Sequence, residues 1–407
     1  MKILQINSVY GYGSTGRIVR DIHHALQQAG DESHVIYSRK SAIGREAGGA
    51  PAEESGVMRI SQPLEFGADV VASVLGDTAG LHSQANTKKI LAEAERLQPD
   101  LIHLHNIHGF YLNGPMLFSF LRRYQKPVVW TLHDCWSYTG YCAYYDYNRC
   151  EGWKSGCRHC PYRGNYPYRV FSHSAANLAW KKEAYAGVDL HLAVPSEWLK
   201  EELQQSILAG CPCTVIPNSI DPAVFHYQEN SLRTRYHLED RRIYLACASV
   251  WMKQKGLLEY QKLSRMLKEG EQLVIIGLSD AQKKLFQNNV LALGSLPAEE
   301  LREWYSTADS FVNLTLEDNY PTVNLEARSC GCPVITYRTG GSPESAGSTG
   351  LSADRGDLAG ILRLLRAHSR QTDAVAAPAQ QMTQEYLALY HELLDYQPSR
   401  TAAGMLK

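Results

Sequence analysis

Hydrophobic and polar positions follow two alternating patterns along this 407-residue chain. Short apolar runs rich in Val, Ile and Leu are typical of buried strands. Longer stretches with an apolar position every three or four residues lie between them and are typical of amphipathic helices. This alternation predicts an α/β fold with parallel sheets. In the first half we predict strands at 2–7, 34–39, 101–105, 128–132 and 190–194, and helices at 16–29, 87–97, 115–123 and 196–208.

The same alternation recurs after a turn rich in Pro, Asn and Asp at 216–222, which we interpret as the join between two domains. Two open parallel sheets in tandem predict a cleft between them, where the carboxyl ends of their strands converge. The expected domains are 1–216 and 217–383, followed by a terminal helical segment over 384–407. In the second half we predict strands at 243–248, 272–277, 290–293, 310–316 and 333–337, and helices at 257–269, 297–308, 322–330, 358–368 and 384–394.

Composition narrows the class of protein. With 41 basic and 42 acidic residues, the chain lacks the strong positive field of a nucleic-acid-binding protein. No apolar run reaches the roughly 18 residues of a membrane-spanning helix, and the first strand is not followed by the features of a signal peptide. We therefore expect a cytoplasmic protein without a nucleic-acid partner, whose cysteines are reduced or bound to metal.

The segment 317–333 has the most informative pattern for chemistry. A predicted strand precedes it, and a short helix begins near Thr322 after a polar turn. The free N–H groups and positive dipole end of such a helix suit an anion such as a diphosphate. Asp318 in the turn and Glu326 in the helix place two carboxylates beside the same cleft, where sugar and ribose hydroxyls are suitable donors. An ordinary turn residue and a solvated helix residue are the alternative interpretation.

This segment resembles the acidic-pair signature of retaining glycosyltransferases of family 4, in which two glutamates separated by seven residues precede an Ala-x-x-x-Gly-x-Pro tail. Asp318 stands at the first position and Glu326 at the second, with Gly331 and Pro333 in the tail. Glu317 is an alternative first acid, one residue out of register. The resemblance implies that the first acid faces the donor sugar and that Glu326 holds the nucleotide ribose. The further donor-binding residues predicted in this turn are Asn319, Tyr320, Pro321 and Thr322.

A glycine-rich loop, 11–16, follows the first strand and opens a helix as G-x-G-x-x-G, which suits a pyrophosphate. The second strand ends with the basic Arg39 instead of an acid. An NADP-dependent oxidoreductase that uses this loop therefore stays open as the alternative function. In family 4 a similar loop borders the donor phosphates, and the resemblance implies that Gly13 and Gly16 bind donor. A turn that needs glycine only for its backbone geometry is the other interpretation.

Lys255, followed by Gly256, comes after the first strand of the second half. A lysine there would neutralise a leaving diphosphate, and a simple surface lysine is the alternative. Family members commonly carry an arginine several residues earlier, where this chain has Val250. The resemblance therefore implies a catalytic role for Lys255 and leaves its partner cation to Lys253, Arg17 or another residue.

His133 and Asp134 come at the end of the strand 128–132, where open α/β sheets place ligand groups. A core histidine bonded to backbone is the alternative. The resemblance implies that His133 contacts the donor sugar and stabilises an oxocarbenium-like transition state. We predict Asp134, together with His105 at the end of another strand, on the acceptor side. No Asp-x-Asp motif is present near the cleft, so no cofactor is expected for catalysis.

A cysteine-rich and aromatic insert, 135–170, follows Asp134. Its thiol spacing predicts a structural zinc; disulfides and buried free thiols are the alternatives. A similar insert occurs in a subset of family 4 enzymes from capsule and exopolysaccharide pathways, which implies a glycan acceptor linked to lipid. Its basic and aromatic side chains also suit peripheral contact with an anionic membrane surface. The predicted zinc ligands are Cys142, Cys150, Cys157 and Cys160.

The resemblance covers nearly the whole chain and implies the GT-B fold, in which two Rossmann-like domains face each other across a cleft. The implied activity is that of a hexosyltransferase-type glycosyltransferase. It would move a sugar from a nucleotide-sugar donor to a glycan or lipid-linked oligosaccharide. The terminal helix is implied to cross back onto the first domain.

Overall fold

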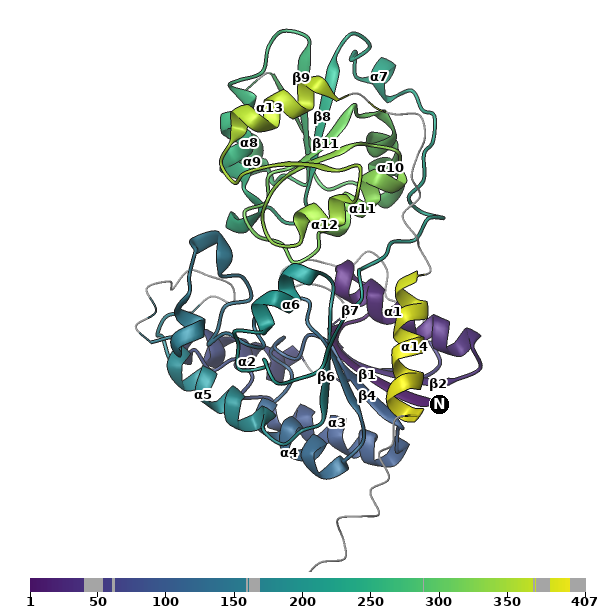
Figure 1. Ribbon diagram of the computed structural model, residues 1–407, viewed down its shortest axis with the longest axis vertical. Coiled ribbons are helices and arrows are strands. Elements are labelled where there is room, and N and C mark those ends of the chain that lie inside the picture. The colour runs from purple at the N-terminus through teal and green to yellow at the C-terminus, as the bar shows by residue number, and fades with distance from the viewer. Residues whose placement is uncertain are drawn as a thin grey trace, which may run out of the picture.

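A computed structural model gives the structure of the chain and describes residues 1–39, 54–60, 63–158, 160, 169–287, 289–368, 370 and 381–395. Two α/β domains are each built on one parallel sheet (Figure 1). This arrangement follows from strands that are buried on both faces, because parallel sheets need helices on each side. The predicted α/β class with two parallel sheets is confirmed.

The first domain contains a sheet with the order β3-β2-β1-β4-β5-β6-β7 in the described residues. Its central strand β1 is buried along nearly its whole length, as a run of apolar residues predicts. The strands are β1 (Lys2–Val9), β2 (Glu32–Arg39), β3 (Val57–Arg59), β4 (Leu101–Leu104), β5 (Val128–Thr131), β6 (Leu190–Val194) and β7 (Cys213–Val215). The helices are α1 (Gly13–Gln28), α2 (Pro63–Gly76), α3 (Gln84–Leu97), α4 (Gly114–Tyr124), α5 (Ser174–Tyr185) and α6 (Glu197–Leu203).

The second domain contains a sheet with the order β10-β9-β8-β11-β12-β13. Its strands are β8 (Arg242–Cys247), β9 (Glu271–Ile276), β10 (Val290–Ala292), β11 (Ser310–Asn313), β12 (Val334–Tyr337) and β13 (Leu351–Ala353). The helices are α7 (Leu232–Arg235), α8 (Leu257–Ser264), α9 (Asp280–Lys283), α10 (Ala298–Thr307), α11 (Thr322–Ser329), α12 (Ser342–Ala346) and α13 (Leu358–Ala367). Short 3-10 helices are η1 (Asp146–Asn148) and η2 (Gly152–Ser155) in the insert, and η3 (Lys253–Lys255) after β8.

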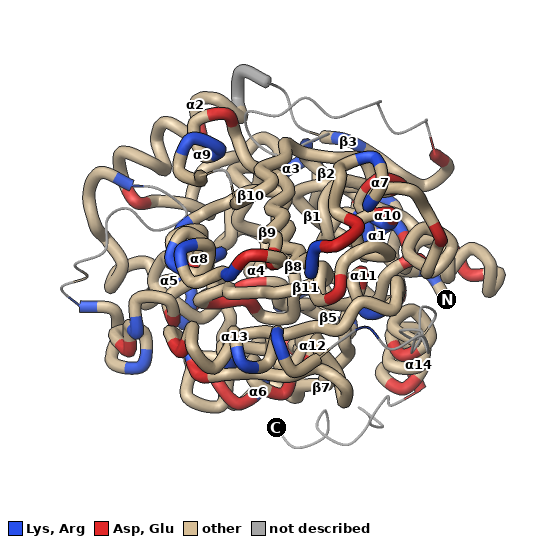
Figure 2. The backbone as a smooth tube through the Cα atoms, turned by 90° about the horizontal axis from the view of Figure 1, so that it is seen from above, with Lys and Arg blue, Asp and Glu red and all other residues tan. Residues whose placement is uncertain are grey.

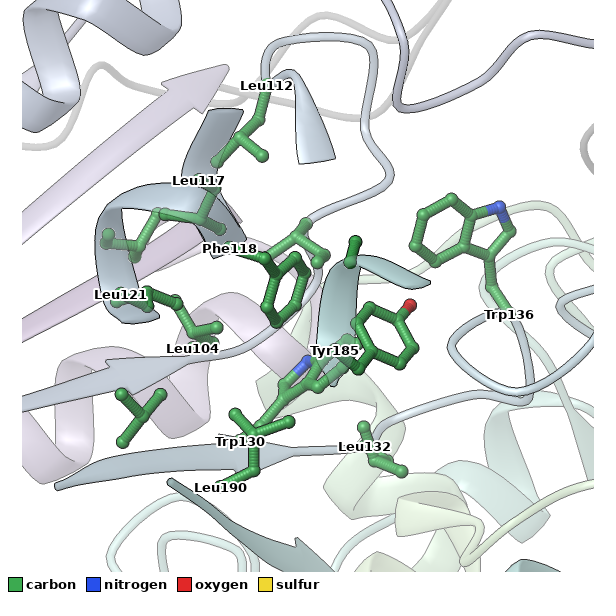
Figure 3. Close-up of a cluster of buried hydrophobic side chains, with 14 of the residues drawn as sticks. Leu104, Leu112, Leu117, Phe118, Leu121, Trp130, Leu132, Trp136, Tyr185 and Leu190 are labelled. Carbon is green, nitrogen blue, oxygen red and sulfur yellow. The ribbon is translucent and has the colours of Figure 1, made fainter. Parts of the chain in front are cut away.

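A buried aromatic cluster fixes the ends of β4 and β5, the strands that lead to the predicted histidines (Figure 3). Trp130 on β5 packs against Phe118 of α4, with ring centroids 5.5 Å apart, and against Tyr185 of α5 at 5.2 Å. Its indole N–H donates to the carbonyl of His105 at 3.0 Å. A buried side chain of the core thus fixes the backbone that follows β4 by a hydrogen bond.

The join between the domains is visible in the core. Ile216 packs in a cluster of the first domain, whereas Ile220 packs in a cluster of the second. Helix α14 (Gln381–Asp395) lies beside α1 on the first domain (Figure 1). Its Tyr386 hydroxyl lies 2.9 Å from the Thr131 hydroxyl, and its Tyr390 hydroxyl lies 2.6 Å from Nδ1 of His103. Residues 396–407 of the predicted terminal segment lie outside the described residues.

Basic and acidic positions are interspersed over the elements when the molecule is seen from above (Figure 2). In the part of the chain that the structure describes, no helix is both long and apolar enough to cross a bilayer.

Candidate active site

Two ion pairs lie where the domains face each other, and they involve both acids of the predicted pair. The Lys255 ammonium contacts the Asp318 carboxylate within the second domain. Arg17 on α1 of the first domain lies 3.6 Å from the Glu326 carboxylate on α11 of the second. The structure therefore pairs Asp318 with Lys255 and Glu326 with Arg17, which the sequence had offered only as one of several partner cations.

Glu326 is 4% exposed, and its carboxylate accepts a hydrogen bond from the Tyr305 hydroxyl at 3.1 Å. Burial raises the pKa of Glu326, and the neighbouring Arg17 and the Tyr305 hydrogen bond partly oppose that rise. A buried carboxylate is costly without such partners. Any ligand that displaces Arg17 must therefore supply hydrogen-bond donors to Glu326.

The two predicted glycines of the first loop have different surroundings. Gly13 has a φ of +65°, and a methyl group added there would meet no atom within 4 Å. A methyl group on Gly16 would lie 3.2 Å from both the Gly11 nitrogen and the Val9 side chain. Gly13 therefore leaves open backbone at the start of α1, whereas Gly16 lets the loop pack on itself. Donor binding stays a prediction for both, and the packing interpretation has structural support at Gly16.

The predicted donor-binding residues in the turn before α11 have different surroundings in the structure. Pro321 is the N-cap of α11 and no side chain caps the helix, so its first N–H groups are available at Thr322. The side-chain nitrogen of Asn319 is buried without a hydrogen-bond partner among the described residues. Tyr320 instead lines a small pocket near the join, beside Pro217 and Met382. The structure does not bring the Tyr320 ring to the ion pairs.

His133 and His105 form a pair of ring nitrogens, with Nε2 of His133 3.0 Å from Nδ1 of His105. Burial lowers the pKa of His133 to about 4 and that of His105 well below its usual range. Both rings are therefore neutral at neutral pH. His105 is 1% exposed, and its Nε2 lies 3.2 Å from the Gln5 side-chain oxygen, so the ring orients His133 from behind.

Asp134 is bonded to a residue that sequence reasoning missed. Its carboxylate accepts from Nε2 of His108 at 2.7 Å and from the Trp136 backbone N–H at 2.9 Å. Burial alone would raise the pKa of Asp134, but the adjacent His108 and these hydrogen bonds lower it. Asp134 thus has no hydrogen bond to the His133 ring. Acceptor-side roles for Asp134 and His105 stay predictions.

In the described part of the insert, Cys135, Cys150 and Cys157 are free thiols. Cys157 accepts a hydrogen bond from the Gly140 N–H at 3.2 Å, and Cys160 accepts one from Arg169 at 3.0 Å. Among the described residues no three His, Cys, Asp or Glu side chains come together in a group that could hold a metal ion. The structure thus lends no geometric support to zinc at Cys142, Cys150, Cys157 and Cys160, and this site stays a prediction. Insert residues 159 and 161–168 lie outside the described residues.

Glu317, the alternative first acid, contacts the insert and not Lys255. Its side chain is fully buried, and its carboxylate accepts backbone N–H groups from Tyr145 and Tyr147 of the insert at 2.9 and 3.0 Å. Asp318, the next residue, is the one that meets Lys255. The structure therefore favours Asp318 as the first acid of the pair.

Two family models match the chain, one in each domain. Residues 15–224 match the model of Glycosyltransferase Family 4, and residues 241–367 match that of Glycosyl transferases group 1. The predicted transferase class is confirmed. The alternative of an NADP-dependent oxidoreductase receives no support from either model.

Similar proteins agree with this assignment. The chain is 25% identical to the putative colanic acid biosynthesis glycosyl transferase WcaC of Escherichia coli, over 97% of this chain and 100% of that protein. The structure matches sucrose-phosphate synthase from Thermosynechococcus elongatus with a TM-score of 0.69 at 17% identity, covering 98% and 100% of the two chains. It also matches Anabaena HepE in complex with UDP-glucose, with a TM-score of 0.57 at 16% identity over 97% and 98%. These likenesses confirm the predicted GT-B fold, and the chain belongs to glycosyltransferase family 4.

Proposed function

We propose that this protein is a retaining glycosyltransferase that moves a sugar from a nucleotide-sugar donor to a glycan acceptor carried on a lipid, in polysaccharide biosynthesis. The main support is the pairing of each predicted acid with a cation, Lys255 with Asp318 and Arg17 with Glu326. A nucleotide-sugar has both partners that these groups need. Its diphosphate pairs with the cations, while its sugar and ribose hydroxyls donate to the carboxylates.

Similar proteins support the finer points. A solved structure of HepE contains UDP-glucose, which supports a nucleotide-sugar donor. WcaC is named for colanic acid biosynthesis, and TuaC of Bacillus subtilis, 29% identical over 39% of this chain and 41% of its own length, is named for teichuronic acid biosynthesis. These names support a polysaccharide pathway.

The proposed reaction is a front-face displacement. The acceptor hydroxyl oxygen forms a bond to the anomeric carbon on the face from which the diphosphate oxygen leaves, and the acceptor proton passes to that departing oxygen. Lys255 and the uncapped N-terminus of α11 stabilise the negative charge that develops on the diphosphate. The neutral His133 ring supplies a hydrogen-bonding group beside the donor sugar. A product with inverted anomeric configuration would contradict this mechanism.

Thermal unfolding in the presence of UDP-, GDP-, ADP- and dTDP-linked sugars tests the donor class. A bound donor at about 100 times its Kd stabilises the folded state by about 2.7 kcal/mol, so one member of the panel should raise the Tm measurably. NADPH serves as the control ligand. A rise with NADPH, and none with any sugar nucleotide, would contradict the proposal.

An apolar surface on the first domain supports a lipid-linked acceptor and peripheral contact with a membrane. We call it the apolar patch: Val71 (58% exposed), Leu75 (51%), Val170 (46%) and Phe171 (61%). The Val170 N–H donates to the Val74 carbonyl at 2.8 Å, which places the two segments side by side. Four side chains are far fewer than the roughly 20–30 residues per partner of a stable protein interface, but suffice for shallow insertion into lipid.

Replacing Phe171 with aspartate should weaken binding to vesicles of phosphatidylglycerol and phosphatidylcholine about tenfold or more, because burial of a phenylalanine contributes roughly 1.5–3 kcal/mol. Flotation of the protein with vesicles measures this partition. Leu258→Asp is the matched control, since Leu258 is 64% exposed on α8 of the second domain. Equal flotation of the two variants would contradict the membrane role of the apolar patch.

A further inference from the structure

The second domain bonds the backbone of the insert at a short turn, residues 145–147. Glu317 accepts backbone N–H groups from Tyr145 and Tyr147 at 2.9 and 3.0 Å. In the loop after β13 of the second domain, the Arg355 guanidinium donates to the carbonyl of Asp146 at 3.0 Å and to the carbonyl of Tyr147. Two side chains of the second domain thus bond both the N–H groups and the carbonyl groups of this turn.

Glu317, the acid in this contact, is fully buried. Glu317 is 0% exposed and forms no ion pair among the described residues; the Cys135 thiol lies 3.9 Å from its oxygen, and the Asp146 carboxyl is a further acid near it. Burial raises the pKa of Glu317 to about 8, although the backbone N–H groups of the turn oppose the rise. Such a desolvated acid is costly unless it is hydrogen-bonded, and the backbone of the turn supplies the donors.

The backbone connects this contact to the proposed reaction centre. Glu317 directly precedes Asp318, which meets Lys255. On the other side of Glu317, the Leu316 N–H donates to the carbonyl of Gln254, the residue before Lys255, at 2.7 Å. Displacement of Glu317 would therefore move Asp318 relative to Lys255.

We propose that Glu317 and Arg355 clamp the turn 145–147 and that the docked insert thereby positions Asp318 against Lys255. Glu317 and Arg355 are positioning residues in this arrangement. The clamp also borders a pocket of about 350 Å³ with walls from both domains, including Tyr145 and Trp153 from the insert and Arg338 and Arg355 from the second domain. The insert is thus a part of the active-site framework and not only a peripheral loop.

Amide hydrogen exchange of the whole protein tests the clamp without an activity assay. In Arg355→Ala, the amides of Tyr145 and Tyr147 should exchange about tenfold faster or more, because the turn opens locally when half of its contacts are lost. The amides of Tyr320 and Gly341, which donate to the Asp318 side chain at 3.3 Å and to the Asp318 carbonyl at 3.0 Å, should also exchange faster. Unchanged exchange at the turn would overturn the clamp, and unchanged exchange at Tyr320 and Gly341 would overturn the positioning of Asp318.

Arg338→Ala is the matched control. Arg338 lines the same pocket, is 60% exposed and pairs with Asp354; among the described residues it has no hydrogen bond to the turn. Its loss should leave the Tyr145 and Tyr147 amides protected; equal acceleration in both variants would overturn the clamp. Glu317→Gln keeps the side-chain shape but turns one accepting oxygen into an amide nitrogen, so it should open the same turn.

The consequence for turnover rests on the proposed function. In Arg355→Ala, kcat at saturating donor should fall about tenfold with the donor KM within about twofold, because a shift of about 1 Å at a reacting group lowers the rate strongly. A donor KM that rises while kcat is unchanged would overturn the positioning role. Absence of turnover in the unaltered protein would count against the proposed function, and the exchange measurements would then decide the clamp alone.

Discussion

Replacement of Lys255 by alanine should lower turnover about a hundredfold or more, the loss seen when a preorganised group that stabilises developing charge is removed. Lys255 ends the 3-10 helix η3 after β8, and its ammonium pairs with Asp318 in the loop after β11. In the proposed reaction it would release Asp318 to the sugar and meet the departing diphosphate. Steady-state kinetics with the donor found by thermal unfolding measure the effect, which should appear mainly in kcat.

Lys253→Ala is the control for this prediction. Lys253 lies on the same 3-10 helix, η3, and is exposed, without an ion pair in the described residues. The two variants remove the same charge two positions apart. Near-normal turnover of Lys255→Ala, or an equal loss in both, would exclude Lys255 as the group that stabilises the leaving diphosphate.

The sequence predicted the parts of the site that come from neighbouring strands. Strands β8 and β11 pair directly, so the loops that follow them lie together at one edge of the sheet. Lys255 and Asp318 are in those two loops, and their contact follows from the pattern of strands and from the rule that ligands bind at carboxyl ends of parallel strands. Helix α11 begins at Thr322, the residue where the polar turn ends in the sequence.

Contacts between the domains could not be predicted in the same way. The Arg17–Glu326 pair depends on how α1 and α11 face each other, and the carboxylate of Glu317 meets backbone N–H groups some 170 positions earlier in the chain. Every residue except proline has a backbone N–H group, so no residue type in the sequence marks the ones that Glu317 meets. Both contacts depend on how the two domains are placed relative to each other. Local hydrophobic periodicity predicts helices and strands but not that placement.

Helix α5 shows a second limit. Its Lys181 is 0% exposed and donates to the carbonyls of Trp136 at 2.5 Å and Thr139 at 2.9 Å, while burial lowers its pKa to about 7. A lysine in the middle of a helix normally indicates an exposed face. Because Lys181 is buried instead, the sequence of α5 lacks a regular spacing of apolar positions and predicts no helix there. The insert backbone supplies the acceptors that make this burial tolerable.

Replacement of Glu326 by glutamine should weaken binding of the donor nucleotide about tenfold to a hundredfold, because hydrogen bonds to a charged group contribute about 1.5–3 kcal/mol. The variant keeps the shape of a side chain that is 6% exposed, so the protein should stay folded. Isothermal titration with the nucleoside diphosphate of the donor gives the Kd. Glu344→Gln is the control: this second-domain carboxylate also accepts first-domain N–H groups, from Glu197 at 2.7 Å and Trp198 at 2.9 Å, but at the start of α6.

The same titration in Arg17→Met and in the double variant separates the two roles open to Arg17. If Arg17 exchanges Glu326 for the diphosphate, both single variants lose affinity, and the double variant loses less than their sum, because each group is the resting partner of the other. If Arg17 serves only to neutralise the buried Glu326, Arg17→Met binds the nucleotide as well as the unaltered protein or better, since no ion pair has to break. That second outcome would leave Lys255 as the cation for the diphosphate and contradict the exchange of ion pairs on which the proposed function rests.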